Sequence, residues 1–333
     1  MANSEIQMKV AALIFDESSH YLDHLAPYCA LQGWPLLVCE EAIALLAKKY
    51  YPDVETLEIP WHQITLPSTI VSCYPHSMLQ AAFPTGKLNT LWLPHGNSDK
   101  GWKSPLIEGL KTEPSLLVYG QKMVDFITEK GLPLSSFQIQ RVGNFRLQYA
   151  QRHARFYQEI LQKTFLLPSA ERTFLYAPTW KDTENNSSFW EAFPILAQAL
   201  PEAYNLLVKL HPNTTRTHAP EIERLIGRYQ NKKNIVWVTE FPPIYPLLQI
   251  CDAYIGDMSS IGYDFLAFNR PMYFLNSQKR DPCIDKGLYL YQCGLEIQPE
   301  NYVNLFQIDK ETRESDLPQF SALREKIYTY TFS

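Results

Sequence analysis

The sequence of 333 residues lacks the features that mark several common classes of protein. Its six cysteines never form a Cys-x-x-Cys pair, the spacing typical of zinc ribbons and dithiol redox sites. No apolar run reaches the ~18 residues that a membrane-spanning helix needs, and residues 1–9 do not show the basic-then-apolar order of a signal peptide. Several cysteines lie in apolar runs, as buried free thiols do. We therefore expect a cytoplasmic protein, with a peripheral contact at the inner face of the cell membrane left open.

Basic residues are not in excess either. The chain has 30 Lys and Arg against 35 Asp and Glu, which gives a formal net charge of -5 and a pI of about 5.9. Proteins that bind nucleic acid normally concentrate basic residues on one face. We expect no nucleic-acid partner, and an anionic ligand would need a local site.

Four common catalytic motifs are also absent. There is no G-x-G-x-x-G after the first expected strand, no G-x-x-x-x-G-K-[ST], no G-x-S-x-G and no H-E-x-x-H. The usual dinucleotide-binding, P-loop, hydrolase and zinc-protease interpretations therefore lack their motifs.

Short β-rich runs alternate with helical patterns along the whole chain. The runs are residues 10–15, 35–38, 69–73, 90–93, 116–119 and 138–142, then 173–177, 205–210, 235–238, 253–255 and 272–275, after a long helical pattern at about 146–164. Such alternation predicts parallel sheets with crossover helices, and the length exceeds what one hydrophobic core usually serves. We predict an α/β protein with two doubly wound, Rossmann-like domains facing across a cleft, at residues 1–165 and 166–312. A helix within 313–333 would pack back on the first domain.

His95 and Gly96 directly follow one of these expected strands. Open α/β sheets bind ligands beyond the carboxyl ends of their strands, so residues in such places are the first candidates for a site. A neutral histidine suits proton removal near pH 7, and a glycine lets the backbone turn sharply or approach a ligand closely. A lone histidine more often makes a structural hydrogen bond. The role of His95 therefore has to be judged together with the residues at the other strand ends.

Polar and cationic side chains end two strands of the second half. Thr179 and Lys181 follow the run 173–177, while Lys209 and His211 lie at the end of the run 205–210. All four side chains suit contacts with phosphate oxygens. Lys209 alternates with apolar neighbours, so a solvent-facing place on a strand is the structural alternative for it.

A strand-turn-helix pattern follows at residues 253–268. Asp257 ends the strand, Ser259 or Ser260 would cap the helix, and Asp264 lies one turn beyond Ser260. A helix N-terminus presents N–H groups and the positive end of a dipole to an anion, although a serine cap is also ordinary at a helix start. Together with the histidine and the cations, the pattern favours base-assisted attack on a phosphorylated donor.

In this order and at roughly this spacing, the motifs resemble those of the CDP-glycerol glycerophosphotransferases, which build teichoic-acid-type polymers. The resemblance covers about residues 92–275. It rests on His95-Gly96 with Lys100, Gly143 with Arg146, Tyr-Ala-Pro-Thr-Trp at 176–180, Leu-His-Pro at 210–212, and Asp257-x-Ser259-Ser260-x-x-x-Asp264 followed by Arg270-Pro271.

The resemblance implies a GT-B fold, in which the second domain holds a CDP-alditol or other nucleotide-activated donor. The first domain would present a polymer or lipid-linked acceptor. His95 would deprotonate the acceptor hydroxyl, which would attack the β-phosphorus of the donor and expel CMP. His211 would contact the pyrophosphate, with Lys209 as its neighbour.

The remaining site residues follow from the same resemblance. Thr179, Lys181, Ser259 and Ser260 would bind donor oxygens, Asp257 or Asp264 would bind a donor hydroxyl, and Lys100 and Arg146 would lie on the acceptor side. Oriented N–H groups and cations would stabilise the developing charge, so neither a metal ion nor a cofactor is expected.

The sequence departs from the family pattern mostly on the acceptor side. Ser98 stands where the family usually has proline, Lys181 stands where arginine is common, and residues 143–148 keep only the Gly and the Arg of a Gly-Tyr-Pro-Arg-Asn-Asp-like segment. Two alternatives stay open. One is a GT-B enzyme that moves a sugar from a UDP-, GDP- or CMP-activated donor by attack on the anomeric carbon, and the other is a non-catalytic nucleotide-binding relative.

Overall fold

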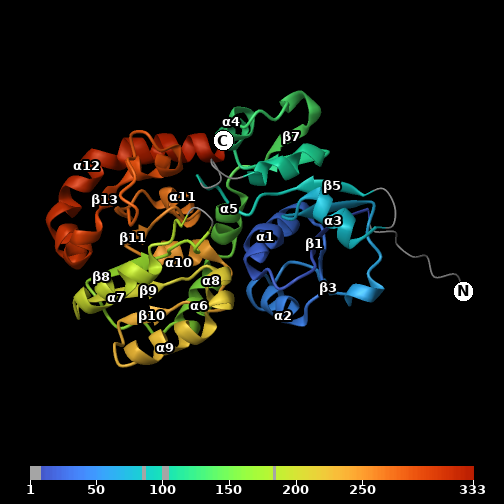
Figure 1. The fold of residues 1–333 in the computed structure, drawn as a ribbon. Coiled ribbons are helices and arrows are strands. Elements are labelled where there is room, and N and C mark those ends of the chain that lie inside the picture. The colour runs from blue at the N-terminus through green and yellow to red at the C-terminus, as the bar shows by residue number, and fades with distance from the viewer. Residues whose placement is uncertain (1–8, 85–87, 100–104, 183–184) are drawn as a thin grey trace, which may run out of the picture.

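Two parallel β-sheets form the centres of the two halves of the protein (Figure 1). The computed structural model describes residues 9–84, 88–99, 105–182 and 185–333. All strand pairs within the described sheets are parallel, and helices pack around both sheets. The structure therefore confirms the predicted α/β class with two parallel sheets.

The first sheet has the strand order β3-β2-β1-β4-β5-β6-β7. The strands are β1 (Val10–Ile14), β2 (Leu36–Val38), β3 (Thr56–Glu58), β4 (Thr69–Ser72), β5 (Asn89–Trp92), β6 (Ser115–Val118) and β7 (Gln138–Arg141). The order builds outward in opposite directions from β1 and β4, so the topological switch point lies between these two strands. Ligands of doubly wound sheets bind at the carboxyl ends beside such a point.

The second sheet has the strand order β10-β9-β8-β11-β12-β13, with its switch point between β8 and β11. The strands are β8 (Arg172–Tyr176), β9 (Tyr204–Val208), β10 (Ile235–Trp237), β11 (Ala253–Gly256), β12 (Met272–Leu275) and β13 (Leu295–Ile297). The sequence pattern does not predict β3 or β13, which are three-residue edge strands and carry partly exposed polar side chains. The other strands lie where the apolar runs predict them.

The helices of the first half are α1 (Leu22–Gln32), α2 (Glu41–Tyr50), α3 (His76–Ala82) and α4 (Gln121–Glu129). Two further helices, α5 (Phe145–Arg152) and α6 (Ala154–Thr164), replace the single long helix predicted at about 146–164. The helix breaks at His153, whose φ and ψ of -107° and 25° lie outside the helical region. Asn144 caps α5, because its side chain accepts a hydrogen bond from the N–H of Leu147 at 3.1 Å. In Figure 1, α5 lies between the two halves.

The helices of the second half are α7 (Phe189–Ala199), α8 (Pro212–Thr217), α9 (Ala219–Tyr229), α10 (Ile244–Ile250), α11 (Ile261–Phe265) and α12 (Leu305–Phe332). The last helix runs from the second sheet back to α4 of the first half (Figure 1). At its end, the N–H of Gln121 donates to the carbonyl oxygen of Ser333 at 2.9 Å, and the Tyr330 hydroxyl donates to Asp125 at 2.7 Å. Residues 312 and 313 therefore lie inside one continuous helix.

The apolar core continues from one half of the protein into the other. The ring of Phe241 lies 5.0 Å from the ring of Tyr50 and 5.3 Å from that of Phe165. Packing of this kind fixes the two sheets relative to each other and brings their strand ends together. Within the described residues, no helix is both long enough and apolar enough to cross a membrane.

Candidate active site

The His95 loop contacts the beginning of α11 from the other half of the chain. Gly96 has a φ of +125°, and a Cβ atom at this position would lie 3.0 Å from both the Cβ and the Oγ of Ser260. Glycine allows both this backbone conformation and this close approach. The structure therefore brings the His95-Gly96 motif to the Ser259-Ser260 motif.

Three histidine rings lie next to one another at this junction. The ring centroid of His20 is 5.5 Å from that of His95 and 5.4 Å from that of His211. His20 lies in a 3-10 turn, Ser19–Tyr21, that follows β1, while His211 follows β9 of the second sheet. The predicted residues His95 and His211 thus meet around a third histidine that the motifs do not reveal. Its one signal in the sequence is its position after the first strand of a doubly wound pattern.

The hydrogen bond that His211 accepts indicates its tautomer. Its Nδ1 accepts a hydrogen bond from the backbone N–H of Asn213 at 3.1 Å, at the start of α8. An accepting Nδ1 leaves the proton of the neutral imidazole on Nε2. The ring of Trp180 lies 6.1 Å from that of His211. Nε2 is therefore the donor nitrogen of the neutral His211 ring.

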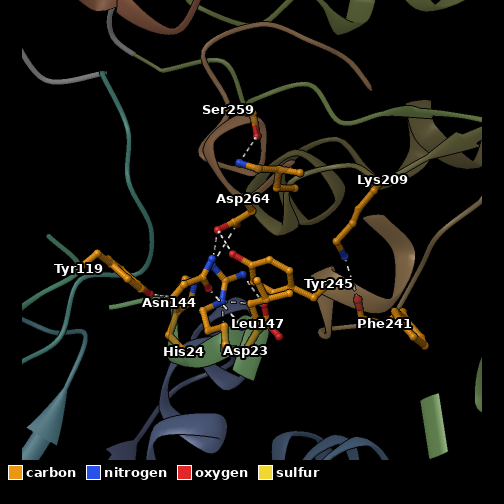
Figure 2. A network of polar contacts seen from close by, with 12 residues as sticks. Asp23, His24, Tyr119, Asn144, Leu147, Lys209, Phe241, Tyr245, Ser259 and Asp264 are labelled. Atoms are coloured by element: carbon orange, nitrogen blue, oxygen red, sulfur yellow. Dashed lines mark hydrogen bonds and ion pairs between the residues drawn. The ribbon is translucent and has the colours of Figure 1, made fainter. Parts of the chain in front are cut away.

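Two cations act on the histidine cluster. Burial, followed by the positive charges of Arg216 and Lys209, lowers the pKa of His20 to about 4. The ammonium group of Lys209 donates to the carbonyl oxygen of Phe241 at 2.8 Å (Figure 2). Burial lowers the pKa of Lys209 to about 8, so this group remains mostly charged at pH 7. Lys209 is thus a partly buried cation beside the cluster, and it is not a solvent-facing strand residue.

Arg146 joins two carboxylates that come from different halves of the protein. Its Nη1 donates to the two carboxylate oxygens of Asp264 at 3.0 and 2.9 Å, and its Nε donates to Asp23 of α1 at 3.1 Å. The hydroxyl of Tyr245 also donates to Asp264, at 3.0 Å. Figure 2 shows Asp23, Tyr245 and Asp264 drawn together in this network.

The charged groups of this network pair with one another. Burial raises the pKa of Asp23 and that of Asp264, and the Arg146 guanidinium opposes both shifts. Burial also opposes the charge on Arg146, but the two carboxylates outweigh it and hold the pKa of Arg146 well above its usual value. Arg146 and Asp264, expected on the acceptor and donor sides, therefore form one buried bridge between the halves.

Asp257 organises the backbone that follows β8. Its Oδ1 accepts from the N–H of Thr179 at 2.7 Å, and its Oδ2 accepts from the N–H and the hydroxyl of Ser188, both at 2.8 Å. Asp257 and Thr179 are each 1% exposed. Both carboxylate oxygens thus bind protein groups, which favours a positioning role for Asp257 over direct contact with a donor hydroxyl.

The two serines do not form the strong helix cap that the sequence predicts. Ser260 occupies the N-cap position, but its backbone is already helical and its side chain makes no capping hydrogen bond. The hydroxyl of Ser259 accepts from the N–H of Ile261 at a long 3.4 Å. Since α11 has only five residues, its dipole contributes less than the prediction assumed.

Asp99 is a further residue that motif analysis missed, four positions after His95. Its carboxylate accepts from the Tyr263 hydroxyl at 2.6 Å and from the Lys122 ammonium at 2.7 Å. It also accepts from the N–H of Leu290 at 3.2 Å. The contacts with Tyr263 and Leu290 hold the His95 loop against the second half of the protein.

Two predicted residues add little to this geometry. Lys181 is exposed, and Lys100 lies outside the described residues. Across the part of the chain that the structure describes, no group of three His, Cys, Asp or Glu side chains has the arrangement of a metal site.

Two parallel sheets that face each other, with the carboxyl ends of their strands at the junction between them, define the GT-B class of fold. Residues 133–291 match the model of a family described as "CDP-Glycerol:Poly(glycerophosphate) glycerophosphotransferase". This match confirms the resemblance that the sequence motifs predict. It includes His211, both serines and Asp264, whereas His20 and His95 lie before it.

Two curated proteins are similar to parts of the chain. The "Teichoic acid glycerol-phosphate primase" of Bacillus spizizenii is 28% identical over 159 residues, covering 40% of this chain and 37% of that protein. The "Teichoic acid glycerol-phosphate transferase" of Staphylococcus aureus is 30% identical over 115 residues, covering 32% of this chain and 27% of that protein. The matches thus span well under half the length of either relative.

Solved structures share the overall fold. The wall teichoic acid polymerase TagF superposes with a TM-score of 0.66 at 15% identity, over 98% of this chain and 85% of that one. Anabaena Alr3699/HepE, solved in complex with UDP and glucose, gives a TM-score of 0.55 at 10% identity, over 98% of this chain and 96% of that one. At these identities the likeness shows the fold alone, and it confirms the GT-B-like architecture.

Proposed function

We propose that this protein transfers glycerol phosphate, or a related alditol phosphate, from a CDP-activated donor to an acceptor hydroxyl. The acceptor would be a polymer or a lipid-linked molecule in the synthesis of a cell-surface polymer or glycolipid. The observation that carries the proposal is that His95 and His211 both lie beside the ring of His20, where the two sheets face each other. The family match over residues 133–291 supports the choice of donor. The role of His95 rests on geometry, since this residue precedes the match.

The proposed reaction needs one base and a set of groups that stabilise negative charge. His95 takes the proton of the acceptor hydroxyl as the hydroxyl oxygen attacks the β-phosphorus of the donor. A P–O bond forms to the acceptor, the bond from the β-phosphorus to the bridging oxygen breaks, and CMP leaves with that oxygen. The Nε2–H of His211 and the ammonium of Lys209 would neutralise charge on the pyrophosphate. These groups allow the transfer without a metal ion or a cofactor.

The remaining predicted residues would support this reaction in different ways. Ser260 lies against the His95 loop, and Ser259 and Ser260 would contact donor oxygens, as would Thr179 and Lys181. Asp257 would act by holding the Thr179 segment in place. Arg146 and Asp264 would act by fixing the two halves of the protein relative to each other.

The proposal includes a cytoplasmic location. All six cysteines are unpaired, as expected in a reducing compartment. A peripheral membrane contact is part of the proposal only as a route to a lipid-linked acceptor. Trp61, which is 43% exposed, is one residue able to make such a contact.

Thermal stability in the presence of candidate donors tests the donor class. A ligand that binds only the folded protein stabilises it by about 2.7 kcal/mol at 100 times its Kd. We expect CDP-glycerol or CDP-ribitol to raise the melting temperature more than CMP alone. A response confined to UDP-, GDP- or CMP-sugars would instead favour a glycosyltransferase, a candidate supported by the fold shared with Alr3699/HepE. Stabilisation by none of these ligands would favour a non-catalytic relative.

Release of CMP from CDP-glycerol then tests the chemistry. The His95→Ala variant should lose turnover by a factor of at least about 100, while its donor affinity stays within about threefold. His62→Ala changes an exposed histidine far from the junction in sequence and is the matched control. Loss of both turnover and donor binding in His95→Ala would show that His95 is structural.

A further inference from the structure

His20 lies at the centre of the candidate site, although the proposed reaction assigns it no role. It follows β1 at the switch point of the first sheet, where doubly wound sheets bind their ligands. Its ring lies between those of His95 and His211, at 5.5 and 5.4 Å, and packs 4.4 Å from the ring of Tyr21. The ring thus occupies the space between the proposed base and the proposed pyrophosphate contact.

A hollow opens beside His20 between the two halves of the protein. Ser18, Ser19 and His20 line it from the first half, and Asn213, Thr215 and Arg216 line it from the second-half helix α8. Its volume is about 310 Å³, within the range of small-molecule sites. The carboxylate of Glu17 also lines the hollow, so the hydroxyl, amide and guanidinium groups supply the donors that an anionic ligand needs against one acidic group.

The two nitrogens of His20 have different surroundings. Nδ1 is buried and makes no hydrogen bond to any residue that the structure describes. A proton on Nδ1 would therefore be a buried donor without an acceptor, which is unfavourable. We therefore assign the proton of the neutral ring to Nε2, which is the nitrogen left to serve a ligand, since His20 lines the hollow and Nδ1 is buried.

Arg216 and Lys209 reinforce this state of His20. Both cations disfavour a positive charge on the ring, and burial acts in the same direction. Arg216 lines the hollow and attracts an anion there, while Lys209 adds positive charge near His20. A neutral N–H beside them can donate a hydrogen bond to an anion without taking part in proton transfer.

From this geometry we infer that His20 binds a phosphate oxygen of the nucleotide-activated donor through its Nε2–H, between His95 and His211. The inference rests on the proposed function, because it requires a donor that carries a phosphate. It adds a third histidine to the site and gives it a binding role that differs from that of the base.

Substitutions that imitate one ring nitrogen at a time provide the test. The amide nitrogen of His20→Gln can occupy the position of Nε2, whereas the amide nitrogen of the shorter His20→Asn can occupy only that of Nδ1. We expect the affinity for CDP-glycerol, measured by calorimetry, to stay within about threefold in His20→Gln. It should fall about tenfold to hundredfold in His20→Asn and His20→Ala, as expected for the loss of a hydrogen bond to a charged group.

Cytidine and His62→Ala serve as controls. Because cytidine carries no phosphate, its affinity should be the same in all His20 variants, and His62→Ala should bind both ligands as the unsubstituted protein does. Equal CDP-glycerol affinity in all variants would overturn the inference. A parallel loss of cytidine affinity would also overturn it, since that result indicates a structural role.

The test also separates failure of the inference from failure of the proposed function. If the unsubstituted protein binds a nucleotide sugar in place of CDP-glycerol, the proposed function is wrong, and the same Gln and Asn contrast measured with that sugar and its free nucleoside still decides the role of His20. If the protein binds no nucleotide at all, both are wrong.

Discussion

Arg146 and Asp264 join the two halves of the protein through a buried ion pair. They lie far apart in the sequence, yet both are at most 4% exposed and share two hydrogen bonds of 3.0 and 2.9 Å. The opposite side of the guanidinium binds Asp23. Because the same junction holds the three histidines, this bridge acts with the apolar packing around Phe241 to fix the two sets of strand ends relative to each other.

Removal of the Arg146 charge should destabilise the whole protein. Arg146→Met leaves Asp23 and Asp264 buried without a cation, and loss of one partner of a buried pair costs about 3–5 kcal/mol. We expect the free energy of unfolding in urea to fall by that amount. Arg155→Met removes an exposed partner of Glu159 and should change it by less than about 1 kcal/mol. A change below about 1 kcal/mol in Arg146→Met would contradict the bridge.

Close contact between Gly96 and Ser260 gives a second prediction. Gly96→Ala adds a Cβ at 3.0 Å from Ser260, at a φ that alanine rarely adopts, and should cost about 1–3 kcal/mol. The displaced His95 loop should also slow CMP release at least about tenfold. Adding Ser260→Gly removes the clashing atoms, so the double variant should recover part of the lost stability.

Gly227 provides the matched control for this experiment. It lies inside α9 with no neighbour within 4 Å of a Cβ atom built there. Gly227→Ala should therefore stabilise the protein by about 0.5–1 kcal/mol, because glycine is less favourable than alanine in a helix. If both glycine variants behaved alike, the contact between the halves would not explain the effect at Gly96.

Asp257 gives a third prediction, about the segment that follows β8. In Asp257→Asn, either amide orientation places an NH₂ group against a backbone N–H, that of Thr179 or that of Ser188. We expect a loss of about 2–3 kcal/mol in the free energy of unfolding and weaker donor binding. Ser188→Ala removes one hydroxyl and should cost about 1 kcal/mol. If Asp257→Asn kept normal stability and lost only donor affinity, that result would favour direct contact between Asp257 and the donor.

Much of the fold could be predicted because the parallel strands are buried apolar runs separated by helical patterns. β12 has all four of its residues buried and was found at its observed bounds. The break between α5 and α6 could not be predicted, because His153 is neither Gly nor Pro and the helical spacing continues across it. The edge strands β3 and β13 could not be predicted, because three partly polar residues are too few to show the alternating hydrophobic pattern of a strand.

The site was predictable only where residues directly follow strands. His95 and His211 were found in this way, whereas His20 lies in a 3-10 turn five residues beyond the end of the expected run 10–15 and belongs to no motif. The pairing of Arg146 with Asp264 depends on how two distant helices pack, which sequence spacing does not encode. The weak cap at Ser260 reflects the short helix that follows it, since a cap pattern does not fix the length of a helix.

The pH dependence of stability should report the neutral state of His20. Between pH 6.5 and about 4 the unfolded chain binds a proton at this residue and the folded protein does not, so the folded state loses stability as the pH falls through this window. Integrated over the window, the contribution reaches roughly 3 kcal/mol. Well above pH 6.5 the ring is neutral in both states, so it costs the folded protein no stability there.

The difference in unfolding free energy between the protein and its His20→Gln variant should therefore change between pH 7 and pH 4.5. It should remain constant between pH 7 and pH 8. A pH-independent difference for His20→Gln would mean that the His20 ring accepts a proton in the folded protein as readily as in the unfolded chain.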